Sequence, residues 1–288
     1  MVVLKVSAFI CLWVSSVVHS ACLSPQKVSE LVAGYPTHPV SGLSVINTLS
    51  DAYCSQNRYL ELLKKQLGDV KGYKVGFTSK AGQQRFKIAS PATGALLERM
   101  FIPNNSKVPL DYGFRTLIEP DFMVIIADNG IMQANSARDT LQYVASIHPF
   151  IELVAMQLAP EEPVTGNRLV AINIAATKAL MGEAIEVQDN DEFYQQIPFI
   201  EAVFSNDKGE VIQKTDAQAL MGHPLEVLFW LIKDFQQRGL TLKAGDKVSL
   251  GATGKLYPIS AEPMTYHYHF SGLSQEPALA SVSMVKAQ

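Results

Sequence analysis

Hydrophobic residues recur mostly at intervals of three and four between residues 25 and 70, which predicts a helical segment there. The pattern is clearest in residues 44–67, and Gly68 follows as a residue typical of a helix end. A second strong helix is predicted between His223 and Gly239, with a proline at its first position and an apolar face along its length.

The pattern changes at about residue 72 into short runs rich in β-branched and aromatic residues, divided by Gly, Pro and Asn. One weaker helix is predicted from Ser136, whose side chain suits an N-cap, to Ile147. Strands therefore outnumber helices in this part, which predicts an α+β fold and argues against a doubly wound βαβ fold. The clearest predicted strands are residues 73–77, 117–127, 197–204 and 247–250.

The start of the chain has the layout of a secretory signal. Lys5 precedes an apolar run over residues 6–18, and small residues follow at Ser20 and Ala21. The run is shorter than the about 20 apolar residues that span a bilayer. We predict that residues 1–21 are a cleaved signal peptide and that the mature protein is secreted or periplasmic, without a transmembrane span. An uncleaved anchor or a buried N-terminal helix is the alternative.

Cleavage near Ala21 places Cys22 at or beside the new N-terminus. Ser20-Ala21-Cys22 resembles the end of a bacterial lipoprotein signal, but His19 stands where an aliphatic residue is preferred, so a lipid anchor is not favoured. The mature chain then holds two cysteines, Cys22 and Cys54, which could pair in an oxidising compartment. The sequence leaves open whether they do.

Composition excludes several classes of protein. Hydrophobic residues make up 48% of the 288 residues and charged residues 18%, as in a globular core rather than a disordered chain. The net charge of −3 and the absence of a basic stripe exclude a general attraction to nucleic acid. No Gly-rich nucleotide fingerprint and no Cys/His cluster of zinc spacing occur.

Three acidic residues stand in apolar surroundings. Glu119 and Asp121 are two positions apart at the start of an apolar run, and on a strand both carboxylates would point to one face. Glu152 is flanked on both sides by aliphatic residues. Like charges so close repel each other, and a hard divalent cation such as Mg²⁺ or Mn²⁺ would resolve the repulsion. The alternative is that all three are ordinary solvent-facing or salt-bridged acids.

Seven stretches together resemble, in order and spacing, the 2-keto-4-pentenoate hydratase branch of the fumarylacetoacetase superfamily. The resemblance extends over roughly residues 45–275, and no single stretch is specific by itself. The stretches are Ala52-Tyr53-Cys54-Ser55-Gln56, Gly72-Tyr73-Lys74-Val75-Gly76-Phe77-Thr78-Ser79, the set Pro91, Gly94, Leu97 and Met100, Glu119-Pro120-Asp121, Pro149-Phe150-Ile151-Glu152, Met221-Gly222-His223-Pro224-Leu225, and Ala244-Gly245-Asp246-Lys247-Val248-Ser249-Leu250-Gly251.

The resemblance implies a fold and a division of the chain. Residues 22–70 would form an N-terminal helical segment, and residues 71–288 a β-rich catalytic domain built on a mixed β-roll or sandwich. It also implies water addition to 2-hydroxypenta-2,4-dienoate, or decarboxylation of a related 2-oxo acid. Family members often form homo-oligomers, so self-association is a further expectation.

The resemblance also assigns roles to individual residues. The metal ion, Mg²⁺ or Mn²⁺, would be held by Glu119, Asp121 and Glu152. Lys74 would be the catalytic residue, as the charged partner of the substrate's carboxylate or enolate oxygen and as a proton donor. Hydrogen bonds to the substrate are expected from Ser79, Asn173 and Thr253, with a loop-capping role as the alternative for Ser79 and Thr253. His223, which precedes a helix-starting proline, is expected to cap that helix rather than to bind a ligand.

Several positions depart from the family pattern. Asp121 replaces a glutamate, apolar and uncharged residues occupy 154–157 where the family has an aspartate and a serine-arginine pair, and Ile172 replaces a polar residue. The metal ligands are thus better preserved than the substrate contacts. Two alternatives follow: an acylpyruvate hydrolase of the same superfamily, and a secreted binding protein that keeps the fold but has lost catalysis.

Overall fold

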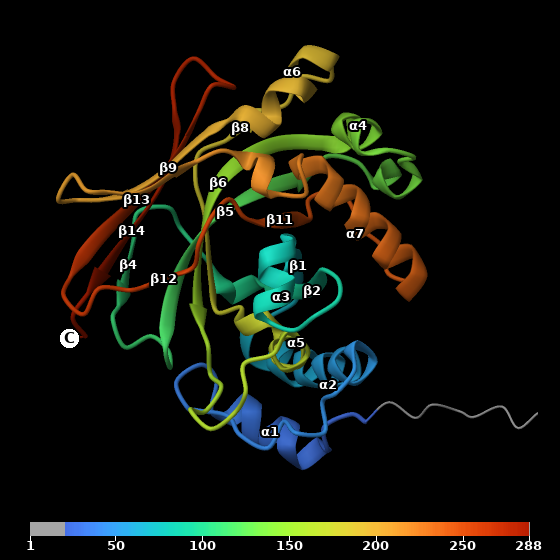
Figure 1. Ribbon diagram of the computed structural model, residues 1–288, viewed down its shortest axis with the longest axis vertical. Coiled ribbons are helices and arrows are strands. Elements are labelled where there is room, and N and C mark those ends of the chain that lie inside the picture. The colour runs from blue at the N-terminus through green and yellow to red at the C-terminus, as the bar shows by residue number, and fades with distance from the viewer. Residues whose placement is uncertain (1–20, 288) are drawn as a thin grey trace, which may run out of the picture.

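The computed structural model describes residues 21–287, so residues 1–20 of the predicted signal peptide lie outside the described residues. Two β-sheets lie beside each other, with a group of helices below the larger one (Figure 1). Within the described part, no helix has the length and apolar character needed to cross a membrane. The helices are α1 (Pro25–Ala33), α2 (Leu49–Leu67), α3 (Lys80–Arg85), α4 (Ala137–Thr140), α5 (Gly166–Ala171), α6 (Asp191–Gln196) and α7 (Pro224–Arg238).

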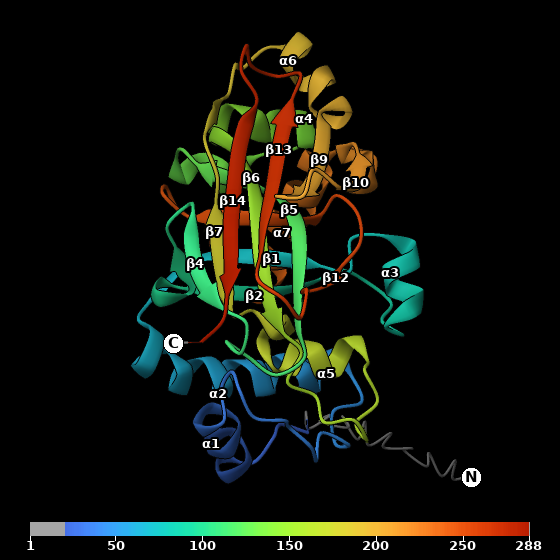
Figure 2. The same cartoon turned by 90° about the vertical axis from the view of Figure 1, so that its left-hand side faces the viewer.

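The larger sheet has the strand order β2-β1-β11-β5-β6-β7-β3, with β12 paired to β5 and β8 to β6. The smaller sheet has the order β10-β9-β13-β14-β4, and Figure 2 shows its long central strands face on. Both sheets mix parallel and antiparallel pairs, which confirms the predicted α+β class. The strands are β1 (Val70–Gly76), β2 (Ala92–Leu97), β3 (Phe101–Ile102), β4 (Ser106–Pro109), β5 (Thr116–Ile126), β6 (Val144–Ala155), β7 (Lys178–Met181), β8 (Ile185–Glu186), β9 (Glu201–Asn206), β10 (Val211–Thr215), β11 (Lys247–Ala252), β12 (Tyr257–Pro258), β13 (Met264–Ser271) and β14 (Ala278–Val285).

Two hydrophobic cores cover the two faces of the larger sheet. One core packs Phe122 of β5 against Phe270 of the smaller sheet, with ring centroids 5.3 Å apart, and includes the apolar face of α7. The other core joins the opposite face to α1, α2 and α5 through residues such as Met123, Phe150 and Leu63. Alternate residues of β5 therefore enter different cores, as the two-residue period of a strand requires.

Helix α2 begins five residues later than the pattern in 44–67 suggested. Thr48 is its N-cap and accepts a hydrogen bond from the Asp51 backbone N–H, while the Asp51 carboxylate accepts one from the Thr48 N–H. This capping box satisfies N–H groups that lack partners within the helix, and it fixes the start there. The helix ends at Gly68, as predicted.

The helix predicted over residues 136–147 is wrong in its second half. Ser136 caps α4 as expected, but α4 is only four residues long and a 3-10 turn over Leu141–Tyr143 follows it. From Val144 onward the chain instead forms β6, which pairs with β5 along its whole length. Cross-strand pairing of β-branched and aromatic residues outweighs the weak helical period of this segment.

The helix predicted after His223 is confirmed as α7. The Nδ1 atom of His223 accepts a hydrogen bond of 3.0 Å from the Leu225 N–H, and its Nε2 lies 3.0 Å from the Tyr194 carbonyl oxygen. Gly239 ends the helix with a φ of 67°, which favours glycine. His223 therefore acts as the helix cap that the sequence suggested.

A disulfide joins Cys22 to Cys54, with the two Cα atoms 5.4 Å apart. It ties the segment before α1 to the middle of α2 and closes a loop between residues 32 positions apart. A sulfur atom in a disulfide is not available for the thioether that anchors a lipoprotein. The structure therefore opposes a lipid anchor at Cys22.

We expect reduction of this disulfide to destabilise the protein. Closing a loop of this length restricts the unfolded chain by about 3–4 kcal/mol in the chain-entropy description. Urea unfolding of the mature protein with and without reductant should show that loss in the free energy of unfolding. A Cys22→Ser/Cys54→Ser variant is the control. Its free energy of unfolding should equal that of the reduced protein and should not change when reductant is added. Equal stability of oxidised and reduced wild type would contradict the prediction.

Candidate metal and substrate site

Three carboxylates meet on one face of the larger sheet. Strands β5 and β6 are antiparallel and place Glu119 directly opposite Glu152, while Asp121 follows two positions further on the same face of β5. One oxygen from each of the three lies within 4.8 Å of the others. The flanking residues Ile118 and Phe122 point into the core on the other face. The structure thus brings together the three acids that the sequence singled out.

Burial makes this cluster costly without a cation. Asp121 is 1% exposed and Glu152 fully buried. The Oδ1 atom of Asp121 and the Oε1 atom of Glu152 have no hydrogen-bond partner among the described residues. Buried oxygens without donors are rare in proteins, because each loses its hydration without replacement. Two such oxygens beside a third carboxylate match the hard oxygen ligands that Mg²⁺ and Mn²⁺ prefer.

The electrostatics of the cluster favour the binding of a cation. Burial raises the pKa of Glu119 to about 7, and Lys74 only partly opposes this effect. Burial, followed by the charges of Glu119 and Glu152, raises the pKa of Asp121 well above its usual value. Three carboxylates share one lysine, so a divalent cation would bring the cluster close to neutrality.

Lys74 lies on β1, two strands away from β5, and its side chain is buried against the carboxylates. Its Nζ donates hydrogen bonds to Oε2 of Glu152 and, at 3.3 Å, to the carbonyl oxygen of Ile174. Burial alone would lower the Lys74 pKa, but the neighbouring carboxylates, Glu152 foremost, raise it above its usual value. Lys74 therefore remains an ammonium group at neutral pH.

A glycine makes room for this lysine. Gly94 on β2 pairs directly with Lys74. A Cβ atom at position 94 would lie 3.2 Å from Cγ of Lys74 and 3.1 Å from the backbone oxygen of Asn173. Both distances are shorter than ordinary van der Waals contacts. The second involves the backbone oxygen of Asn173, which cannot move aside as a flexible side chain could. Gly94 therefore fits a position where two segments approach β2 closely.

Ser249 is a site residue that the sequence analysis did not single out. It lies on β11, between β1 and β5, where it pairs with Lys74 on one side and Met123 on the other. Its Oγ donates a hydrogen bond of 2.7 Å to Oδ2 of Asp121. Ser249 lay within a stretch that resembled the family, but only the register of β11 against β1 sets it beside Lys74.

A short segment over Asn173–Ala175 covers one edge of the site. Asn173, Ile174 and Ala175 have φ angles of 60°, 51° and 56°, a left-handed conformation that β-branched residues such as Ile174 avoid. The Asn173 amide holds this segment in place, because it donates to the Ala95 carbonyl oxygen and accepts from the Ala95 N–H at 2.8 and 2.7 Å. This anchored backbone presents the Ile174 carbonyl oxygen to Lys74.

The three residues expected to bind substrate lie in different surroundings. Ser79 is on the cavity wall, where its Oγ caps α3 by accepting a hydrogen bond of 3.1 Å from the Gly82 N–H. Asn173 is bonded to β2 and is not among the cavity-lining residues. Thr253 is buried, and its hydroxyl shares a hydrogen bond of 2.7 Å with Tyr268. Of these three residues, Ser79 alone lines the described cavity.

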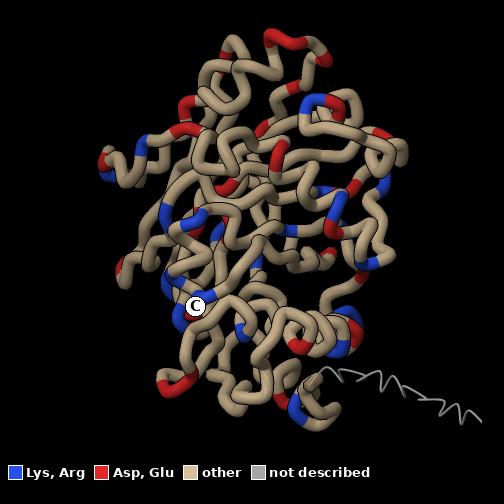
Figure 3. The backbone as a smooth tube through the Cα atoms, turned by 45° about the vertical axis from the view of Figure 1, so that its right-hand side comes forward, with Lys and Arg blue, Asp and Glu red and all other residues tan. Residues whose placement is uncertain are grey.

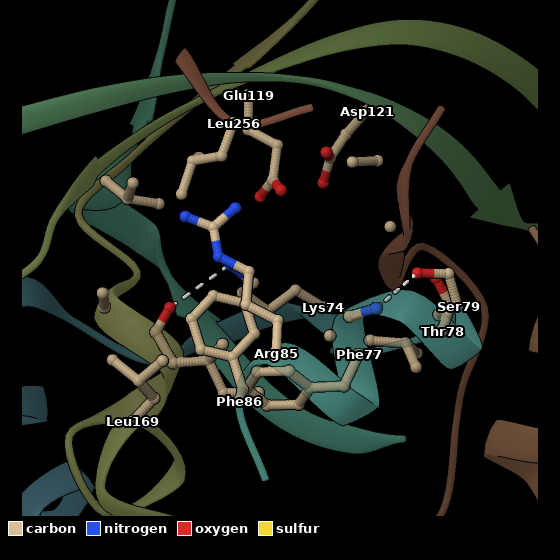
Figure 4. Close-up of a pocket in the computed structure, with 18 of the residues that line it drawn as sticks. Lys74, Phe77, Thr78, Ser79, Arg85, Phe86, Glu119, Asp121, Leu169 and Leu256 are labelled. Carbon is tan, nitrogen blue, oxygen red and sulfur yellow. Dashed lines mark hydrogen bonds between the residues drawn. The ribbon is translucent and has the colours of Figure 1, made fainter. Parts of the chain in front are cut away.

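A cavity of about 280 Å³ extends from the carboxylates toward the surface. Figure 4 shows Glu119 and Asp121 on one side, with Phe77 and Phe86 facing them across the space and Arg85 directed into it. Met156, one of the apolar departures from the family pattern, is part of the wall. The cavity therefore combines one charged end with largely apolar walls, as small-molecule sites often do.

Proteins similar in sequence are hydratases of 2-oxo acids. The 2-keto-4-pentenoate hydratase of Burkholderia vietnamiensis is 26% identical over 223 residues, which cover 77% of this chain and 82% of that protein. The 2-oxo-hept-4-ene-1,7-dioate hydratase of Escherichia coli is 25% identical over 228 residues, or 78% and 84% of the two chains. No protein-family model matches the chain. These relatives confirm the resemblance to the 2-keto-4-pentenoate hydratase branch.

Solved structures confirm the fumarylacetoacetase-like fold. The 4-oxalocrotonate decarboxylase from Pseudomonas putida G7, complexed with magnesium and adipate, has a TM-score of 0.76 at 19% identity and covers 91% of this chain and 97% of its own. Fumarylpyruvate hydrolase from Pseudomonas aeruginosa, in complex with Mn²⁺ and pyruvate, has a TM-score of 0.52 at 15% identity over 75% and 89% of the two chains.

The raised carboxyl pKa values predict how stability depends on pH. Between about pH 5 and 8 the unfolded chain has already released protons that Glu119 and Asp121 retain in the folded, metal-free protein, so stability should fall as pH rises. Mg²⁺ or Mn²⁺ binds the deprotonated carboxylates, so the rise in melting temperature that it causes should grow with pH.

Thermal unfolding at pH 5, 6.5 and 8, with metal and with chelator, checks this prediction. Glu119→Gln should weaken both the pH dependence and the metal effect. Glu161→Gln is the control, because Glu161 is an exposed acid that is not part of the carboxylate cluster or the cavity wall. If the melting temperature is the same with metal and with chelator at every pH, the result would argue against a cation site.

Proposed function

We propose that this protein is a metal-dependent hydro-lyase that adds water to a short 2-hydroxydienoic acid such as 2-hydroxypenta-2,4-dienoate. The observation that carries the proposal is the cluster of Glu119, Asp121 and Glu152 beside Lys74, at one end of a cavity with largely apolar walls. The hydratases among its relatives support the same reaction. Decarboxylation of a related 2-oxo acid would use the same groups.

The proposed cofactor is Mg²⁺ or Mn²⁺, held by Glu119, Asp121 and Glu152. The magnesium and Mn²⁺ in the structural relatives support this assignment, as do the buried carboxylate oxygens without partners. When bound, the ion supplies Lewis-acid stabilisation to the oxygen atoms at one end of a 2-oxo acid. Ser249 would support it indirectly, because its hydrogen bond fixes the orientation of the Asp121 carboxylate.

Lys74 is the proposed catalytic residue. An ammonium group has three N–H donors, of which Glu152 and Ile174 take two, and the third is available to a substrate oxygen. Because its pKa is raised, Lys74 serves as a hydrogen-bond and proton donor rather than as a base. Ser79, on the cavity wall, is the proposed partner for a further polar group of the substrate.

The proposed reaction consists of two balanced proton movements and one addition. The dienol loses its 2-hydroxyl proton and gains a proton at C5, which gives a conjugated 2-oxo acid. Water then adds its hydroxyl group to C4 and a proton to C3, giving 4-hydroxy-2-oxopentanoate. The apolar wall of Phe77, Ile174 and Leu256 would exclude bulk water from the hydrocarbon part of the substrate.

We expect Lys74→Met to lower kcat/KM for 2-hydroxypenta-2,4-dienoate by roughly 10²–10³-fold, because a positioned proton donor is lost. The loss of ultraviolet absorbance of the conjugated dienol in the presence of Mg²⁺ or Mn²⁺ is the measurement. Lys178→Met is the matched control. Lys178 is a half-buried lysine on β7, paired with Leu153, whose side chain lies on the other face of the sheet from Glu152.

The same assay separates the alternative functions. Wild-type activity that survives complete removal of metal would overturn the proposal. Turnover of an acylpyruvate, with no hydration of the dienol, would favour the hydrolase, although no histidine lines the described cavity to serve as a base for water. A metal-dependent rise in melting temperature without turnover of any 2-oxo acid would favour the secreted binding protein.

Arg85 favours a substrate with a second carboxylate. It lies at the C-terminal end of α3 and lines both the cavity at the carboxylates and a wider neighbouring cavity, which Arg115 also lines. Once a divalent cation balances the acids, these arginines leave the outer part of the site positive. The hydratase of a 1,7-dioate among the relatives supports the same inference. We therefore propose a 2-oxo dioic acid as a second candidate substrate.

Replacement of Arg85 tests this candidate. Arg85→Met should raise KM for a seven-carbon 2-oxo-4-ene dioate by roughly 10–100-fold, the contribution of a charge-assisted hydrogen bond. KM for the five-carbon monoacid should change little, which makes the monoacid the internal control. An equal rise in KM for the two substrates would mean that Arg85 contributes to the shape of the cavity and does not bind a second carboxylate of the substrate.

The location of the protein is a separate proposal. The disulfide between Cys22 and Cys54 supports an oxidising compartment, as does the signal-like composition of residues 1–21. We therefore propose that the protein is exported to the periplasm or secreted. Its helical segment at 22–70, its β-rich domain at 71–288 and its self-association remain predictions from the sequence and the resemblance.

A further inference from the structure

The first described residues lie along one face of α2. The backbone N of Ala21 donates to Oδ1 of Asp51 at 2.7 Å, and the Leu23 N–H donates to Oγ of Ser55 at 3.0 Å. Arg58 donates to the Leu23 carbonyl oxygen at 2.7 Å. These three partners are spaced at three and four residues, so they form one row on the helix. The short segment from Ala21 to Leu23 is therefore held by side chains of α2.

Asp51 is the unusual member of this row. It is 6% exposed, and its Oδ2 accepts hydrogen bonds from the Thr48 and Asn47 N–H groups at 2.9 and 3.2 Å. Hydrogen bonds, that from Ala21 foremost, lower its pKa, so the carboxylate stays ionised. No lysine or arginine in the described part of the chain forms an ion pair with it. Within the described residues, its charge is therefore met by backbone N–H groups, two of them at the start of α2, and by no side-chain cation.

The sequence offers a source for that cation. Small side chains stand at Val18 and Ser20, at the third and first positions before the Ser20–Ala21 bond, which is the pattern of a signal cleavage site. We propose that the bond cleaved during export is Ser20–Ala21, one residue before the boundary expected from the sequence, and that the new α-ammonium group of Ala21 forms an ion pair with Asp51. This inference rests on the proposed export of the protein.

The chemistry needs only water and an endopeptidase of the export route. Water adds its hydroxyl group to the carbonyl carbon of Ser20, the C–N bond breaks, and the nitrogen of Ala21 leaves as an amine that takes up a proton. That nitrogen is the same atom that lies 2.7 Å from Oδ1 of Asp51. Cleavage thus converts a hydrogen bond between a neutral amide and a carboxylate into a charge-assisted one.

The neighbouring contacts agree with cleavage at this bond. Ala21 is exposed, so an extra residue is not needed to fill the core, whereas Leu23 is buried. Cleavage one bond later would remove Ala21 and leave Asp51 without its closest donor. Lipid attachment at Cys22 would require the sulfur that the disulfide with Cys54 uses. The disulfide and the ion pair would then hold adjacent residues on the same helix.

Export of the full chain from a bacterial host, followed by intact mass and N-terminal sequencing, is the first test. We expect a chain that begins at Ala21 with a free amine and one intramolecular disulfide. A chain that begins at Cys22, with or without lipid, would overturn this inference but not the export. An uncleaved, cytoplasmic chain would overturn both, whereas the hydratase assay is independent of either result.

A coupling measurement tests the ion pair itself. A chain that retains Ser20 has an amide in place of the α-ammonium, and its melting temperature should be roughly 2–4 °C lower than that of the Ala21 chain. The same extension in an Asp51→Asn background should have no effect, because the partner charge is absent. Equal effects in both backgrounds would overturn the ion pair. If the Asp51→Asn variant does not fold, acetylation of the Ala21 amine in the wild type is the alternative experiment. It should lower the melting temperature by the same amount as retention of Ser20.

Discussion

The pairing of β5 with β6 is the constraint on which the rest of the site depends. Antiparallel register sets Glu119 opposite Glu152, and like charges in that position destabilise a sheet unless something lies between them. Two strands on the same side of this pair compensate the charge. β1 contributes the ammonium group of Lys74, and β11 contributes the hydroxyl group of Ser249. The whole site can be understood as the compensation of one unfavourable cross-strand pair.

The need to balance the charges of Glu119 and Glu152 also explains Gly94 and the left-handed backbone at Ile174. Lys74 can reach Glu152 only because Gly94 leaves space on the adjacent strand. The left-handed backbone at Ile174 then supplies a carbonyl oxygen to the same ammonium group. Conformational strain of this kind persists where the surrounding structure holds it, and here the amide of Asn173 does so through two hydrogen bonds to β2.

The sequence predicted the parts of this arrangement that follow from short-range periodicity. Two positions along a strand share a face, so Glu119 and Asp121 could be grouped without a structure, and the caps at His223 and Gly239 identified α7. The roles expected for Asn173 and Thr253 came from resemblance alone, and the structure engages both with the protein itself. Ser249 and Arg85 were missed because their importance depends on which strands and helices become neighbours, which local patterns do not contain.

The five polar groups at the charged end, which are the three carboxylates, Lys74 and Ser249, come from four adjacent strands of one sheet. The rest of the cavity wall comes mainly from α3, α5 and connecting segments. The spacing of strands in a sheet is nearly invariant, so the charged end has little freedom to drift. Connecting segments accept insertions and substitutions far more readily. The catalytic groups and the substrate-contacting groups therefore lie on different parts of the structure. Related proteins can change the substrate that they bind while the catalytic groups keep their positions. Val154 lies on strand β6 and Met156 directly after it, and both line the cavity. In this protein the departures from the family pattern therefore also affect residues on or beside the sheet.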